Sequence, residues 1–102
     1  MSFGTRGAIT IIGWAIDESA QREAGGVLIA VDDEHTLTVK YGMDRPDVAR
    51  AFGNNRCRFA GFVASLDASS MKIGHHKLKI NVLTADRSGY YESDQKIDIQ
   101  IR

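Results

Sequence analysis

Three tyrosines and an arginine–aspartate pair are the side chains best suited to bind a polar ligand: Tyr41, Arg45, Asp47, Tyr90 and Tyr91. An aromatic ring can stack on the apolar C–H face of a sugar, while polar groups beside it bond the hydroxyls. All five residues are expected at strand ends, where loops position functional groups. They are therefore the candidate residues of a ligand site, with a saccharide as the ligand class.

Two of these candidates have a structural alternative. Arg45 and Asp47 flank the only proline of the chain, so a local ion pair that fixes this turn competes with a ligand contact. The adjacent Tyr90 and Tyr91 must point to opposite sides of an extended chain, which leaves at least one of them exposed. Trp14 lies in an apolar run and is expected in the core rather than in a site.

Metal and thiol chemistry find little support in the sequence. His75 and His76 would point to opposite faces of a strand, which is poor geometry for one metal ion. Residues 32–34 are acidic but lack the spacing of a calcium loop, so we expect a solvated hairpin tip. Cys57 is the only cysteine and is expected to be buried and inert. No metal site, cofactor or catalytic residue is predicted, although a hydrolase or metal site on the two histidines and the acids remains a minor alternative.

Composition indicates one domain over residues 1–102. The chain has 13 basic and 13 acidic side chains, a formal net charge of zero and 43% hydrophobic residues. This length supports one hydrophobic core, which excludes a multi-domain protein. The balanced charge disfavours nucleic acid as a partner. No apolar run approaches the roughly 18 residues of a membrane span, so no membrane insertion by this chain is expected. Residues 1–7 lack the pattern of a signal peptide.

The hydropathy pattern predicts mainly strands. Apolar and polar residues alternate in several short runs, and Pro46, Asp47 and Gly53 have the types expected at the first position, first turn and end of a helix. Val48 and Phe52 should then face inward together. The expected strands are residues 8–17, 27–31, 36–41, 58–66, 76–84, 90–92 and 96–102, with 27–31 and 36–41 forming a hairpin, and the helix is residues 46–52.

This arrangement predicts an all-β fold, an antiparallel immunoglobulin-like β-sandwich of about seven strands with one short helical turn near residues 46–52. A small barrel is the alternative. Gly61, inside an expected strand, indicates a bulge or the close approach of another backbone. A sandwich of this size offers little room for a catalytic pocket, so we do not expect an enzyme.

Five landmarks together resemble a known kind of module. They are GWAxD at residues 13–17, YGxxRPDV at 41–48, GF at 61–62, GxHxL at 74–78 and YYE at 90–92. In this order they resemble a small bacterial Ig-like accessory module that is appended, outside the membrane, to membrane-embedded glycosyltransferase-like and surface-associated proteins. The resemblance covers nearly the whole chain. One departure is residues 19–24, which contain no proline in the loop after Asp17.

The resemblance implies a non-catalytic module beside glycan or envelope chemistry, in the periplasm or at the cell surface. Weak recognition of an envelope saccharide is the first functional hypothesis, and it predicts that Tyr91→Ala abolishes binding with little change in stability. The alternative is a structural or protein-interaction module that pairs through an edge strand, residues 96–102, with a second copy or with its parent protein.

Overall fold

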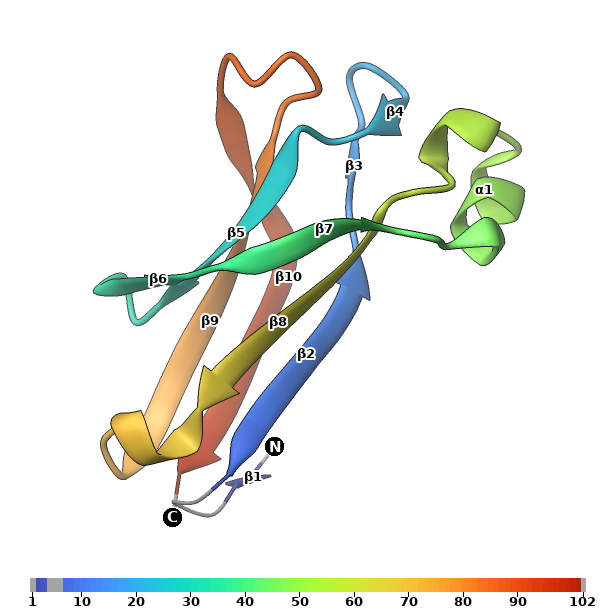
Figure 1. The fold of residues 1–102 in the computed structure, drawn as a ribbon. Coiled ribbons are helices and arrows are strands. Elements are labelled where there is room, and N and C mark those ends of the chain that lie inside the picture. The colour runs from blue at the N-terminus through green and yellow to red at the C-terminus, as the bar shows by residue number, and fades with distance from the viewer. Residues whose placement is uncertain (1, 4–6, 102) are drawn as a thin grey trace.

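The computed structural model describes residues 2–3 and 7–101 of the chain. It contains two facing sheets and one short helix at one end (Figure 1). The elements are β1 Ser2–Phe3, β2 Ala8–Trp14, β3 Ile16–Asp17, β4 Arg22–Glu23, β5 Gly26–Val31, β6 His35–Leu37, β7 Val39–Met43, α1 Pro46–Phe52, β8 Gly61–Asp67, β9 Gly74–Leu83 and β10 Tyr90–Ile101, with single 3-10 turns η1 at Asn55–Cys57 and η2 at Ala68–Ser70. None of the helices in this part of the chain is long and apolar enough to cross a membrane.

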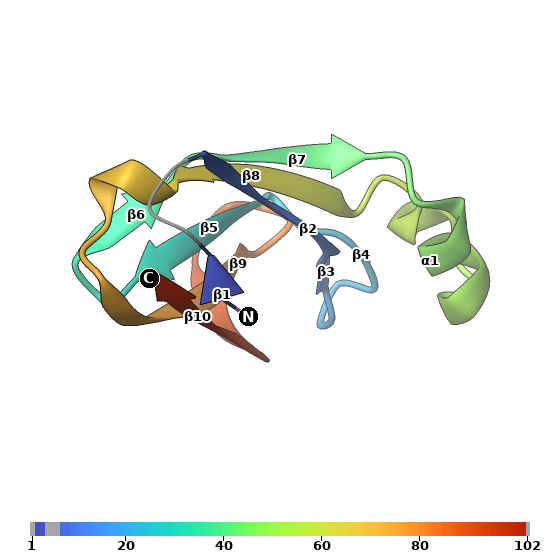
Figure 2. The same ribbon diagram turned by 90° about the horizontal axis from the view of Figure 1, so that it is seen from below.

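The strand order is that of an immunoglobulin-like sandwich. One sheet has the order β1-β10-β9-β5-β6 and the other β2-β8-β7, while β3 and β4 form a separate ribbon. In the usual lettering β2, β8 and β7 occupy the places of strands B, E and D, and β5, β9 and β10 those of C, F and G. Figure 2 shows the two sheets as stacked layers with α1 projecting from one end. The predicted all-β sandwich with a helix at residues 46–52 is therefore confirmed.

The core lies between the two layers, and the residues that fill it come from alternating positions. Leu78, Ile80 and Val82 of β9 are buried, as are Ile99 and Ile101 of β10. Ile29 of β5 lies beside Ile80 in the same sheet, and Phe62 of β8 faces them from the other sheet. The alternation predicted for these last two long strands is confirmed. A second, smaller cluster of buried residues packs beneath α1: Ile16, Val48, Cys57 and Ala60.

The predicted strand 36–41 is in fact two strands in different sheets. β6 pairs with β5 through Leu37, Thr36 and His35, whereas β7 pairs with β8 on the opposite layer. Leu37, Val39 and Tyr41 nevertheless all pack against the one core. The chain passes from one sheet to the other between β6 and β7, but apolar and polar residues keep alternating because both sheets face the same core. The hydropathy pattern therefore did not reveal the change of sheet.

Helix α1 begins and ends where the sequence predicted. Pro46 is at its start, and Gly53 adopts φ +59° and donates its backbone N–H to the carbonyls of the last turn. Val48 is buried as expected, but Phe52 is 44% exposed. The expectation that both would face inward is therefore wrong for Phe52, because its ring instead lies edge-on to Trp14, with centroids 5.5 Å apart.

Trp14 was expected in the core, but it is only partly buried. The three-stranded sheet covers the core with one face only, so the other face of β2 points away from the core. Ile12 is 73% exposed, and Trp14 is only half-buried against the smaller cluster. A run of β-branched residues is compatible with an edge as well as with a central strand.

Candidate binding cleft

The five predicted ligand residues are placed in different surroundings rather than on one surface. Tyr41 lies between the layers, where its hydroxyl donates to Ala15 O at 2.6 Å and accepts from Ala24 N at 2.9 Å. Burial of this phenol raises its pKa to about 12. The hydroxyl of Tyr41 is thus engaged by the main chain of the protein.

Arg45 and Asp47 form the local ion pair that was the structural alternative. The Arg45 Nε and Nη2 donate to the two Asp47 carboxylate oxygens at 3.0 and 2.9 Å. This bidentate pair lowers the pKa of Asp47 to about 2. A third guanidinium nitrogen, Nη1, reaches Gly13 O at 3.4 Å. The pair therefore links the beginning of α1 to β2.

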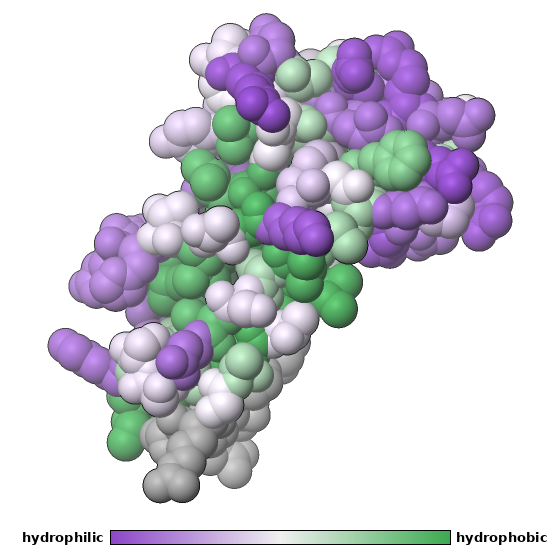
Figure 3. Space-filling model, viewed as in Figure 1, coloured by the Kyte–Doolittle hydropathy of each residue, from purple (hydrophilic) through white to green (hydrophobic). Residues whose placement is uncertain are grey.

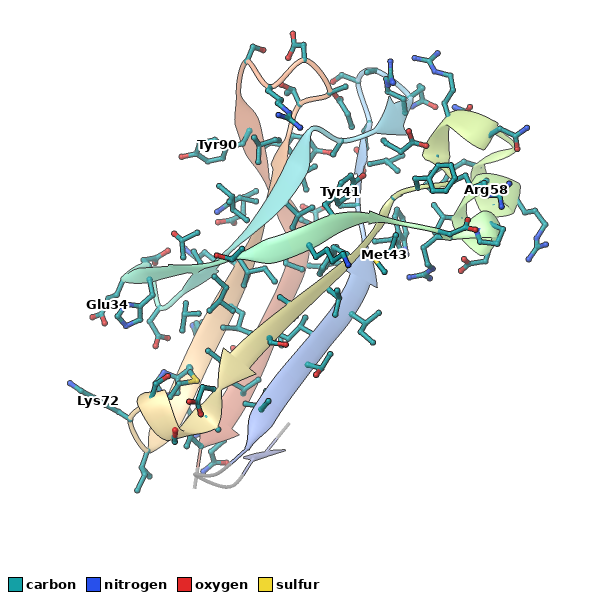
Figure 4. The ribbon with its side chains drawn as sticks, viewed as in Figure 1. Glu34, Tyr41, Met43, Arg58, Lys72 and Tyr90 are labelled. Carbon is teal, nitrogen blue, oxygen red and sulfur yellow. The ribbon has the colours of Figure 1, made fainter. Side chains whose placement is uncertain are left out.

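Tyr90 and Tyr91 point to opposite sides of β10, as predicted. Tyr90 is 68% exposed, and Figure 4 shows its ring directed away from the body of the sandwich. Tyr91 is half-buried against the core, and its hydroxyl donates to Ile16 O at 2.5 Å. Because this side chain packs and bonds inside the fold, we now expect Tyr91→Ala to lower stability, in contrast to the expectation from sequence.

A cleft on the open side of the sandwich brings together other residues. It has a volume of about 330 Å³ and lies between the end of β2 with β3 and the first half of β10. Four of its lining residues come from the end of β2 and the residues that follow it: Trp14, Ala15, Ile16 and Glu18. The others come from β9 and β10 of the five-stranded sheet: Val82, Tyr91, Glu92, Ser93, Asp94 and Gln95. Only Tyr91 was among the residues that the sequence indicated.

An irregularity in β10 shapes one wall of this cleft. The register between β10 and β9 shifts between Glu92 and Lys96, so that Ser93, Asp94 and Gln95 lie outside the regular ladder. Such bulges bend a strand and redirect its side chains. The polar run at 93–95, which interrupts an otherwise alternating strand, was the sequence signal that could have pointed here.

The cleft combines aromatic rings with oxygen-bearing side chains. Trp14 and Tyr91 come from different sheets, and the acidic residues Glu18, Glu92 and Asp94 are among the lining residues, although the Glu92 carboxylate lies 3.8 Å from Lys79 Nζ. Rings offer apolar faces, whereas carboxylates and the Gln95 amide accept hydrogen bonds from hydroxyl groups. In the part of the chain that the structure describes, no three histidine, cysteine or acidic side chains gather as a metal site would require.

A charged pair lines a second hollow at the other end of the molecule. His76 Nδ1 lies 2.5 Å from Asp32 Oδ2, and its Nε2 lies 2.7 Å from the carbonyl oxygen of Lys72. Because both partners accept, both ring nitrogens must donate, so this geometry holds the imidazolium form. The hydrogen bond to Asp32 raises the pKa of His76, and the same bond lowers that of Asp32.

The sequence underestimated Asp32. The acidic tip at residues 32–34 was expected to be solvated, yet Asp32 Oδ1 also accepts from Lys77 N at 2.8 Å. Asp32 and Asp33 adopt φ +53° and +59°, the conformation of a tight hairpin turn. His75 is exposed and His76 is mostly covered, which confirms the expected division of the two histidines.

Asp17 and Cys57 are both buried but differ in their bonding. Asp17 is 4% exposed, and its carboxylate accepts from Ala20 N at 3.1 Å and Ala85 N at 2.8 Å. The bond from Ala85 N, followed by that from Ala20 N, lowers its pKa. Cys57 is buried as predicted, and burial raises the pKa of its thiol, which disfavours the reactive thiolate.

Comparisons with protein-family models, with curated proteins and with solved structures find no match to this chain. The resemblance to an Ig-like accessory module therefore stays a prediction from its landmarks.

Proposed function

We propose that this protein is a non-catalytic recognition module that binds a saccharide in the cleft between β2 and β10. The observation that carries the proposal is that Trp14 and Tyr91, from different sheets, line one hollow together with acidic and amide residues. This is the combination of apolar faces and hydrogen-bond acceptors that a sugar ring requires. Of the five residues predicted from sequence, Tyr91 remains in this site.

The proposed contacts divide between two kinds of side chain. The rings of Trp14 and Tyr91 offer apolar surface to the C–H face of a pyranose, while Glu18 and Gln95 accept from its hydroxyls. The Glu92 carboxylate is not counted among these contacts, because it lies 3.8 Å from Lys79 Nζ. The Tyr91 hydroxyl is already bonded to Ile16 O, so its ring rather than its oxygen is offered to the ligand. An open cleft with few such contacts gives millimolar affinity, about 4 kcal/mol of binding free energy.

The test is a titration of the isotope-labelled protein with a panel of bacterial-envelope saccharides, followed by amide NMR. The panel follows from the resemblance, which implies a module outside the membrane beside envelope glycans. We expect shifts at residues 14–18 and 91–95, with a parallel change in the fluorescence of Trp14, the single tryptophan. Shifts confined to residues 41–48 and 90 would instead restore the site first predicted, and a silent panel would overturn the proposal.

A pair of amide variants provides the control. Gln95→Ala removes an acceptor from the cleft, whereas Gln100→Ala truncates an exposed amide further along the same strand. We expect Gln95→Ala to weaken binding several-fold and Gln100→Ala to leave it unchanged. Equal affinities for both variants would remove Gln95 from the site.

A second candidate function is an interaction module that pairs through an edge strand. Of the strand predicted for this role, 96–102, residues 96–101 lie in β10 and residue 102 is outside the described residues. β10 pairs with β9 on one side and at Gln100 and Ile101 with β1 on the other. A different edge, β2, has the composition that favours pairing, with no charged residue and no proline.

A further inference from the structure

Strand β2 is an edge strand without the usual protection against pairing. No strand in the part of the chain that the structure describes pairs with it on the side opposite β8. Its seven residues, AITIIGW, include no charge and no proline. Edge strands of soluble proteins normally carry a lysine, a proline or a bulge, or are very short. β2 has none of these features and is therefore open to another strand.

The other edges of the two sheets are protected. β7 carries Lys40 and an irregularity in its pairing between Tyr41 and Met43. β6 has only three residues, and the free side of β10 is partly taken by β1. The contrast singles out β2 as the edge that can accept a partner strand along its whole length.

The hydrogen bonding of β2 shows which of its backbone groups are available. Ala15 N donates to Ala60 O at 3.0 Å, and these two residues continue the register in which Trp14 lies opposite Gly61. Bonded and non-bonded pairs alternate along an antiparallel ladder. Residues 9, 11 and 13 therefore bond to β8, whereas the N–H and C=O groups of residues 8, 10, 12 and 14 point to the free edge.

The side chains on the same positions form an apolar outer face. Ile12 is 73% exposed on this face, opposite Val63 of β8, and Thr10 lies two residues away on the same side. Figure 3 shows mostly green and white surface over the three-stranded sheet, interrupted by single purple side chains, while purple predominates over α1 and the upper loops. A strand added beside β2 would extend this face and place its own side chains next to Thr10 and Ile12.

We propose that β2 pairs with β2 of a second copy in an antiparallel, two-fold symmetric manner, which joins the two three-stranded sheets into one of six strands. A second copy is the fitting partner because an uncharged strand meets no like charge when it faces itself. The register that uses all seven residues places Ile11 on the axis and Thr10 opposite Ile12 of the other copy. This deepens the second candidate function, and it shares only Trp14 with the proposed saccharide cleft.

The pairing is expected to be weak. A seven-residue strand pair buries less than the roughly 1,600 Å² of a standard stable interface. We therefore expect dissociation at low concentration and a dimer above about 100 µM. Sedimentation across this range, combined with concentration-dependent hydrogen exchange, tests both the association and its location.

The backbone alternation gives the exchange experiment its specificity. The amides of Thr10 and Ile12 should become protected as concentration rises, whereas those of Ile9 and Ile11 are bonded to β8 at every concentration. A monomer at 1 mM would overturn the proposal. Association that leaves the exchange of Thr10 and Ile12 unchanged would overturn it as well, because the contact would then lie elsewhere.

Two variants act on the edge by different means. Ile12→Lys places a charge on an exposed side chain of the edge, and Ile73→Lys makes the same change at a residue of equal exposure, 74%, outside β2. Thr10→Pro removes an N–H that faces the free edge, a position where strands tolerate proline. We expect Ile12→Lys and Thr10→Pro to associate at least tenfold more weakly than the unmodified chain. Ile73→Lys should associate as strongly as the unmodified chain.

The two proposals can fail separately. Thr10 and Ile12 are not among the residues that line the saccharide cleft. A folded Ile12→Lys monomer that retains the saccharide-induced shifts would separate pairing from binding. Equal association of all three variants and the unmodified chain would overturn the β2 pairing whatever the saccharide result.

Discussion

The hydroxyls of Tyr41 and Tyr91 donate to the carbonyl oxygens of two consecutive residues, Ala15 and Ile16, at 2.6 and 2.5 Å. Tyr41 belongs to β7 and Tyr91 to β10, so the two bonds tie the junction of β2 and β3 to both layers. The same junction forms one wall of the cleft. Its position therefore depends on two side chains that the sequence suggested as ligand contacts.

Removing the Tyr41 hydroxyl should weaken the fold. In Tyr41→Phe, Ala15 O loses a donor and Ala24 N loses an acceptor. We expect the free energy of unfolding to fall by about 1–3 kcal/mol, because partly buried polar groups are left unpaired. Urea denaturation measures this loss, and Tyr90→Phe, at an exposed tyrosine, is the control with little expected change. A Tyr41→Phe protein as stable as the unmodified chain would contradict the structural role.

The hydrogen bond between His76 and Asp32 should make the stability of the fold depend on pH. Stability should fall both when Asp32 is protonated at low pH and when His76 loses its proton at higher pH. Because the pKa of His76 is raised in the folded protein, His76 contributes fully to stability below about pH 6.5, the ordinary pKa of histidine. This contribution to stability is lost as pH rises through the folded pKa. Because the pKa of Asp32 is lowered, Asp32 contributes fully to stability above pH 3.8, the ordinary pKa of its carboxyl group. This contribution to stability is lost as pH falls through the folded pKa. The pair thus contributes most between about pH 4 and 6.5.

The variant His76→Gln isolates this contribution. We expect a loss of about 1–2 kcal/mol near pH 5.5, which shrinks at alkaline pH, where the unmodified histidine is neutral as well. Thermal or urea unfolding at several pH values measures the difference. His75→Gln, at the exposed neighbour, is the matched control. A constant difference between His76→Gln and the unmodified chain from pH 5 to 9 would count against a charged His76.

Asp17 should contribute far more to the free energy of unfolding than a surface carboxylate does. Its two backbone bonds link the turn after β3 to the turn before β10. We expect Asp17→Asn to cost about 2 kcal/mol at pH 7. Since the folded pKa is lowered, this difference is present above pH 3.8 and declines as pH falls through the folded value.

Asp33→Asn is the matched control for Asp17. It removes an exposed carboxylate that is 3.2 Å from Lys79 Nζ, a kind of surface ion pair that contributes little. Acid denaturation of both variants beside the unmodified chain gives the comparison. Similar losses in the two variants would show that burial and backbone bonding at Asp17 are unimportant.

A methyl group at Gly13 should strain the core. A Cβ there would lie 2.7 Å from Cζ of Phe62, whose ring is buried between the layers. We expect Gly13→Ala to cost about 1–3 kcal/mol through overpacking. Gly89→Ala is the control, because a Cβ at Gly89 meets nothing within 4 Å. Equal stability of the two variants, measured by urea unfolding, would refute this close contact.

The sequence by itself determined the local elements. The alternation at Leu78, Ile80 and Val82 predicted a strand with one buried face, and Pro46 and Gly53 marked the limits of α1. These signals are local, because side-chain direction and backbone preference depend on residues a few positions apart. Gly61 was predicted to allow a close approach, and the structure places Met43 O 3.1 Å from the position of its absent Cβ.

Only the tertiary structure decided which strands lie at edges and which distant residues meet. Periodicity is the same for a central and an edge strand, so it left Ile12 and the free side of β2 unrecognised. Asp17 finds its partner 68 residues away at Ala85, and Trp14 shares a cleft with Gln95. Such contacts are set by the order of strands in two packed sheets, a long-range arrangement that no local pattern in one sequence records.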